Sequence, residues 1–160
     1  TYERFEDLPV WQTAMQLAEG VFRLTDDRSF GAKVIAHQIQ RAAISVGNNI
    51  AEGFERGTTQ ELLTCLYIAR GSAGEVRSML LLTERLPYFV HLQSQISDLK
   101  SLAESASRQV LAWADSLQNS PVRGQRYLSE HTRQRDQQDR RAAAFWGQLE
   151  AEHRRRFAGE

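Results

Sequence analysis

The sequence contains very little cysteine. Cys65 is the only one among the 160 residues, so no disulfide can form within the chain and no cysteine-based metal site can be built. A single cysteine is typical of proteins that stay in a reducing compartment. We therefore expect a cytoplasmic protein.

Long hydrophobic runs are also missing. A helix that spans a bilayer needs roughly 20 consecutive, mostly apolar residues, and charged side chains interrupt this sequence well before that length. The stretch Tyr2-Glu3-Arg4-Phe5-Glu6-Asp7 is too charged for a secretory signal peptide. We expect no contact with a membrane.

Strand signals are absent, because no segment alternates apolar and polar residues between hairpin turns. Apolar residues instead recur every three to four positions, as on the buried face of a helix. Four such stripes cover residues 10–24, 34–54, 62–86 and 90–117. Four long helices with short connections predict an all-α fold, an antiparallel up-and-down four-helix bundle over residues 1–119.

Local signals predict where these helices begin and end. Pro9 fits the first turn of the first helix, and Ser29 is placed to cap the second. Thr58 and Glu61 have the spacing of a capping box at the start of the third. Pro87 then ends that helix.

Residues 120–160 differ in composition from the predicted bundle. Gln, Arg, Asp and Ser dominate from Gly124 to Arg141, a stretch too polar to bury. Phe145, Trp146 and Leu149 then outline a short amphipathic helix. We predict a flexible C-terminal polar arm with a short helix. Its candidate residues for binding nucleic acid or a partner are Arg123, Arg126, Arg133, Arg135, Arg140, Arg141, Phe145, Trp146, Arg154, Arg155 and Arg156.

Polar residues also recur inside the central helical stripes. Polar side chains beside a core cost free energy unless each finds a partner, so their regular spacing favours a structural network between the second and third helices over a ligand site. Gly71 and Gly74 are unfavourable inside a helix and predict the close approach of a neighbouring backbone. The network is predicted to contain Arg41, Ser45, Asn49, Glu52, Ser72 and Glu75.

Motifs that carry catalysis are missing. A di-metal site in a bundle needs two Glu-x-x-His pairs, and the only match, Glu150 to His153, lies in the arm. His37 and His91 have no carboxylate or cysteine partner at ligand spacing. No Gly-x-Ser-x-Gly elbow and no glycine-rich phosphate loop occurs. We predict a non-enzymatic protein with no catalytic residue, no metal ligand and no cofactor.

Several short motifs together resemble one known family. The chain is similar, over roughly Tyr2 to Leu117, to small bacterial four-helix-bundle proteins encoded in intervening sequences of large-subunit ribosomal RNA genes, which include the accessory variability proteins of diversity-generating retroelements. The residues that carry the resemblance are Phe5-Glu6-Asp7-Leu8, Val10-Trp11-Gln12, Gln38-Ile39-Gln40-Arg41-Ala42-Ala43, Asn49-Ile50-Ala51-Glu52-Gly53 and Ile68-Ala69-Arg70-Gly71-Ser72 with Glu75.

The resemblance implies a homopentamer without known enzymatic activity, which in the retroelement branch binds nucleic acid and a reverse transcriptase. The residues alone leave two functions open. Arginines interleaved with aromatic side chains fit RNA or DNA binding, whereas Phe145, Trp146 and Leu149 also fit a helix that docks in a groove of a partner protein. We therefore expect a homo-oligomeric adaptor that helps assemble a nucleoprotein complex, with a protein-only scaffold as the alternative.

Overall fold

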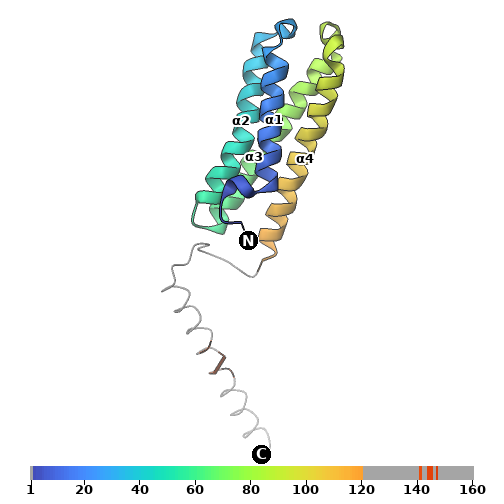
Figure 1. Ribbon diagram of the computed structural model, residues 1–160. Helices are drawn as coiled ribbons and strands as arrows, with labels where there is room; N and C mark the ends of the chain where they lie inside the picture. The colour runs from blue at the N-terminus through green and yellow to red at the C-terminus, as the bar shows by residue number, and fades with distance from the viewer. Residues whose placement is uncertain (1, 121–140, 142–143, 146, 148–160) are drawn as a thin grey trace, which may run out of the picture. The chain divides into compact units, whose positions relative to one another are not determined.

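The computed structural model describes residues 2–120, 141, 144, 145 and 147. Over these residues the chain is helical and contains no strand, so the predicted all-α four-helix bundle is confirmed (Figure 1). The elements are the 3₁₀ turn η1 (Phe5–Asp7), α1 (Pro9–Asp26), η2 (Arg28–Phe30), α2 (Lys33–Glu55), α3 (Thr59–Arg85), η3 (Pro87–Leu92) and α4 (Gln93–Gln118).

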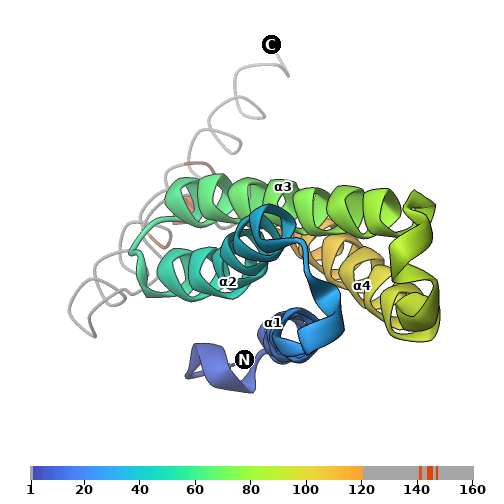
Figure 2. The same cartoon turned by 90° about the horizontal axis from the view of Figure 1, so that it is seen from above.

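The four helices pack around a square, with neighbours antiparallel. Helix α1 contacts α2 and α4, and α3 contacts the same two helices, so α1 and α3 are diagonally opposed (Figure 2). The bundle belongs to the compact unit Thr1–Gly124; residues 141, 144, 145 and 147 belong to a second unit, Gln125–Glu160. None of the described helices is long and apolar enough to cross a membrane.

The predicted stripes form an interior of two apolar clusters. One surrounds Phe30 and Phe89, whose ring centroids are 4.8 Å apart, at the end that holds the α1–α2 and α3–α4 connections. The other surrounds Ile50, Leu62 and Leu66. Burial of a large apolar side chain contributes about 1.5 to 3 kcal/mol relative to exposure, so these clusters are the main source of stability.

Three of the predicted helix boundaries are confirmed. Pro9 is the first residue of α1. The Thr58 hydroxyl accepts the Glu61 N–H at 3.2 Å and donates to Glu61 Oε2 at 2.7 Å. Pro87 follows the last residues of α3, as predicted.

The predicted cap of the second helix is wrong. Ser29 lies in η2, and its N–H donates to Asp27 Oδ1 at 2.8 Å. Because this carboxylate holds both the N–H and the hydroxyl of Ser29, the chain makes a 3₁₀ turn there, and α2 begins only at Lys33 without a side-chain cap.

The apolar stripes are also shorter than predicted. Val90 is 69% exposed in η3, and α4 begins at Gln93. Val34 and Leu82, assigned to the stripes from their spacing, are exposed. Helical spacing alone does not show where the buried sector of a helix ends.

The prediction for the glycines of the third helix is wrong within the protomer. A Cβ atom at Gly71 or Gly74 would meet nothing within 4 Å. The close approach occurs instead on α2. A Cβ at Gly53 would lie 2.8 Å from Cys65 Cβ and 3.0 Å from Leu62 Cδ1, so α2 and α3 are in contact where only glycine fits.

We predict opposite effects of alanine at Gly53 and at Gly74. Gly53→Ala overpacks the α2–α3 contact and should cost about 1 to 3 kcal/mol. Gly74→Ala, on an exposed helix surface, should stabilise the fold by up to about 1 kcal/mol. Chemical denaturation of both variants measures this, and equal midpoints would contradict the packing described here.

Candidate functional site

A chain of hydrogen bonds joins α2 to α3 at half height of the bundle. The hydroxyl oxygens of Ser45 and Ser72 are 2.8 Å apart, and Ser72 Oγ also donates to the Ile68 carbonyl at 3.1 Å. Asn49 Nδ2 donates to Ser45 O at 2.8 Å and to Ser45 Oγ at 3.0 Å. The Ser72 hydrogen is directed to the Ile68 carbonyl, so Ser45 donates to Ser72 and each hydroxyl has a partner.

Only these three of the six predicted network residues are joined. Arg41 and Glu75 are exposed, and neither forms an ion pair or hydrogen bond within the described part of the chain. The prediction of a buried network that includes them is therefore wrong for the single chain. On α2 the side of the helix that carries Ser45 and Asn49 faces α3, whereas Arg41 lies further out.

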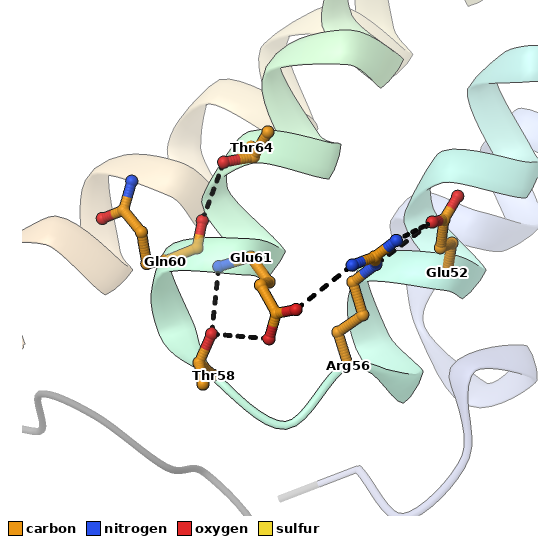
Figure 3. A network of polar contacts seen from close by, with 6 residues as sticks. All are labelled: Glu52, Arg56, Thr58, Gln60, Glu61 and Thr64. Atoms are coloured by element: carbon orange, nitrogen blue, oxygen red, sulfur yellow. Dashed lines mark hydrogen bonds and ion pairs between the residues drawn. The ribbon is translucent and has the colours of Figure 1, made fainter.

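Glu52, the sixth predicted member, belongs to a separate cluster at the α2–α3 turn (Figure 3). Arg56 Nε donates to Glu52 Oε1 at 3.1 Å, and Arg56 Nη1 donates to Glu61 Oε1 at 3.1 Å. The hydrogen bond from Thr58, followed by that from Arg56, lowers the pKa of Glu61. One arginine thus connects the last turn of α2 to the first turn of α3.

The lowered pKa of Glu61 predicts a pH dependence of stability. A carboxylate that is harder to protonate in the folded state than in the unfolded state stabilises the fold above its ordinary pKa of about 4.3, and this contribution is lost as pH falls through the folded value. Glu61→Gln should therefore reduce the loss of stability on acidification. Thermal melts between neutral and acid pH measure it, with the exposed Glu55→Gln as the control.

A third polar group, which the sequence did not suggest, connects the two loops at the other end of the bundle. His91 Nε2 lies 2.7 Å from Ser29 Oγ, and the same hydroxyl donates to Asp27 Oδ1 at 2.5 Å. Hydrogen bonds from Ser29 lower the pKa of Asp27. The Asp27-x-Ser29 spacing is a local turn signal, but no local pattern points to His91.

The pairing of serine and histidine invites comparison with a nucleophile and its general base. In a catalytic triad the carboxylate accepts from the imidazole and orients it. Here Asp27 accepts the hydroxyl hydrogen of Ser29 instead, so that hydrogen is directed away from the imidazole. The geometry fits a structural hydrogen bond between two loops and does not fit an activated nucleophile.

The hollows on the surface of the described bundle include one between α1 and α2 and one beside the N-terminal segment. One has a volume of about 480 Å³ and is lined by Phe22, Val34, His37, Gln38, Gln40, Arg41 and Ile44 of α1 and α2. The other has a volume of about 430 Å³ and is lined by Tyr2, Leu8, Pro9, Val10, Phe54, Gln109, Ala112 and Trp113. Among the described residues, no group of three or more His, Cys, Asp or Glu side chains could hold a metal ion.

Most of the predicted arm residues fall outside the described part of the chain. Arg141 and Phe145 are described; both are helical and exposed, and their spacing of four puts them on one face. The residues outside the description are Arg123, Arg126, Arg133, Arg135, Arg140, Trp146, Arg154, Arg155 and Arg156.

Residues 6–112 match the family of 23S rRNA-intervening sequence proteins. The chain belongs to this family. The match confirms the resemblance predicted from the motifs, and it covers nearly all of the bundle but stops before the arm. No curated protein matches the chain.

A solved structure from a family with a different name has the same fold. It is a protein of unknown function from the S23 ribosomal protein family of Bacteroides thetaiotaomicron VPI-5482, similar to this chain with a TM-score of 0.60 and 21% identity. The similarity covers 66% of this chain and 97% of that one. At this identity it supports the four-helix bundle of this intervening-sequence protein and nothing further.

Replacement of Asn49 tests whether the α2–α3 chain of hydrogen bonds stabilises the fold. Asn49→Ala removes the donor to Ser45 and should cost about 1 kcal/mol relative to Asn48→Ala, its exposed neighbour on the same helix. The paired comparison cancels the better helix propensity of alanine. Equal denaturation midpoints for the two variants would contradict a stabilising role.

Proposed function

We propose that this intervening-sequence protein is a non-enzymatic, homo-oligomeric adaptor that binds nucleic acid through its C-terminal arm and helps to assemble a nucleoprotein complex. The proposal rests on the distribution of arginine. Half of the 18 arginines follow Pro121, among them the clusters Arg140-Arg141 and Arg154-Arg155-Arg156.

The charge of the arm differs from that of the bundle. Acidic residues outnumber basic ones before residue 120, and several bundle cations, such as Arg56 and Lys100, already pair with carboxylates. Affinity for a phosphate backbone comes mainly from cations that replace counterions. The arm is therefore the better candidate for contact with RNA or DNA, and exposed Arg141 and Phe145 supply a cation and a ring for a base to stack on.

An adaptor also needs a surface for proteins. The bundle exposes large apolar side chains on α1, α2 and α3, among them Phe22, Val34 and Ile68. Such exposure favours self-association or a protein partner. The family resemblance implies two kinds of partner, further copies of the chain in a homopentamer and a reverse transcriptase. In such an oligomer, several arms acting together would strengthen the weak affinity of a single arm for nucleic acid.

The rival function is a protein-only scaffold. Phe145 is 58% exposed on a helical segment, and an apolar helix can dock in a groove of a partner without contacting nucleic acid. Dependence on salt separates the two functions, because phosphate contacts weaken steeply as salt rises and apolar docking does not.

We predict that loss of the arm weakens nucleic-acid binding and leaves the bundle folded. Truncation after Asn119 removes no bundle helix, since α4 ends at Gln118. A full-length variant with Arg140, Arg141, Arg154, Arg155 and Arg156 replaced by Gln keeps the length of the arm and removes its clustered charge. For every phosphate that the arm no longer neutralises, the slope of log affinity against log salt on single-stranded RNA should become shallower by about 0.7.

Titration of labelled single-stranded RNA and duplex DNA at several salt concentrations measures both variants against the parent. Unchanged affinity and slope would assign binding to the bundle. If no form binds nucleic acid while the full chain captures a protein through Phe145 and Trp146, the scaffold function is correct.

A further inference from the structure

The hollow on α1 and α2 is an apolar surface with a positive charge. Phe22, Val34 and Ile44 are 37%, 78% and 40% exposed along its wall. Arg41 lies among them, exposed and without an ion pair in the described part of the chain. This combination suits an occupant that has apolar side chains around a carboxylate.

The outer face of α3 has that combination. Ile68, Glu75 and Leu82 are seven residues apart, so they lie in one line along the helix, and Ile68 and Leu82 are 51% and 46% exposed. Glu75 is exposed and, among the described residues, forms no ion pair. Gly71, one turn from both Ile68 and Glu75, leaves space in which a neighbouring helix can come close.

The spacing on the two surfaces also matches. Val34 precedes Arg41 by seven residues on α2, and Leu82 follows Glu75 by seven residues on α3, in each case about 10 Å along the helix. When two such helices pack antiparallel, an Arg41–Glu75 pair puts Val34 level with Leu82. The same register puts Ile68 level with Asn48, one turn beyond Ile44.

Among the described residues no side chain of α3 lines the hollow, and Arg41 and Glu75 form no ion pair with each other. The hollow spans α1 and α2, and α3 is diagonally opposite α1 (Figure 2). We propose that the outer face of α3 of one copy occupies the α1–α2 hollow of a second copy, with Glu75 paired to Arg41. This inference rests on the self-association in the proposed function and assigns the residues that mediate it.

The contact is heterologous, because each copy contributes a different surface. A pair of copies then keeps one free hollow and one free α3 face, so contacts continue from copy to copy until a ring closes. This contact accounts for three features of the described residues, which are the charges of Arg41 and Glu75 without an ion pair and the open space over Gly71.

Charge reversal tests the contact on the full-length chain. Arg41→Glu and Glu75→Arg each place like charges together and should weaken association about ten-fold or more. Combining the two substitutions in one chain should restore association, because the reversed charges then pair at every contact, whatever the number of copies in the ring. Asp98→Arg, an exposed change on α4, should leave association unchanged.

Sedimentation velocity over a range of protein concentrations gives the mass of each sample, and circular dichroism checks that each variant is folded. Loss of mass in the two single variants and recovery in the double variant support the contact. An associated parent whose mass neither variant changes overturns this assignment and leaves the proposed function intact. A monomeric parent overturns the contact and the self-association of the proposed function together.

Discussion

The close packing of α2 against α3 is the constraint on which the rest of the bundle depends. These two helices meet at Gly53, where a Cβ atom would overlap Cys65. The Ser45–Ser72 hydrogen bond fixes their register a little further along. Helix α4 packs against another side of α3, and α1 packs less extensively against α2 and α4. The residues that set the contact are small or polar, and large apolar side chains fill the space around it.

The fold was predictable from sequence because its signals are local and repeated. Helical periodicity identified all four helices, and Pro9, Thr58 and Pro87 marked boundaries that the structure confirms. Ser29 failed as a cap because a stronger acceptor, Asp27, lies two residues upstream. The prediction of core positions was wrong for Val34, Leu82 and Val90. Apolar periodicity shows which direction around a helix faces the core, but it does not show how wide the buried part of the helix surface is.

The polar sites were only partly predictable, for a related reason. Spacing put Arg41, Ser45, Asn49 and Glu52 on one ridge of α2. Whether a residue on that ridge contacts α3 depends on its exact direction around the helix axis, and sequence spacing gives this direction only coarsely. Ser45 and Asn49 point toward α3 and are partly buried, whereas Arg41 is exposed. The His91–Ser29 contact joins residues 62 positions apart, and a pair that distant has no signature in a single sequence.

An even number of antiparallel helices returns the chain to the end from which it started. Residue 2 and residue 120 therefore lie at one end of the bundle, and the loops joined by Ser29 and His91 lie at the other (Figure 1). A fluorescent protein or an affinity handle joined at residue 2 or directly after residue 120 would attach at the same end of the bundle. Tethering experiments that need an unobstructed surface should approach from the loop end, because attachments at residues 2 and 120 lie away from the Phe30–Phe89 cluster and its covering loops.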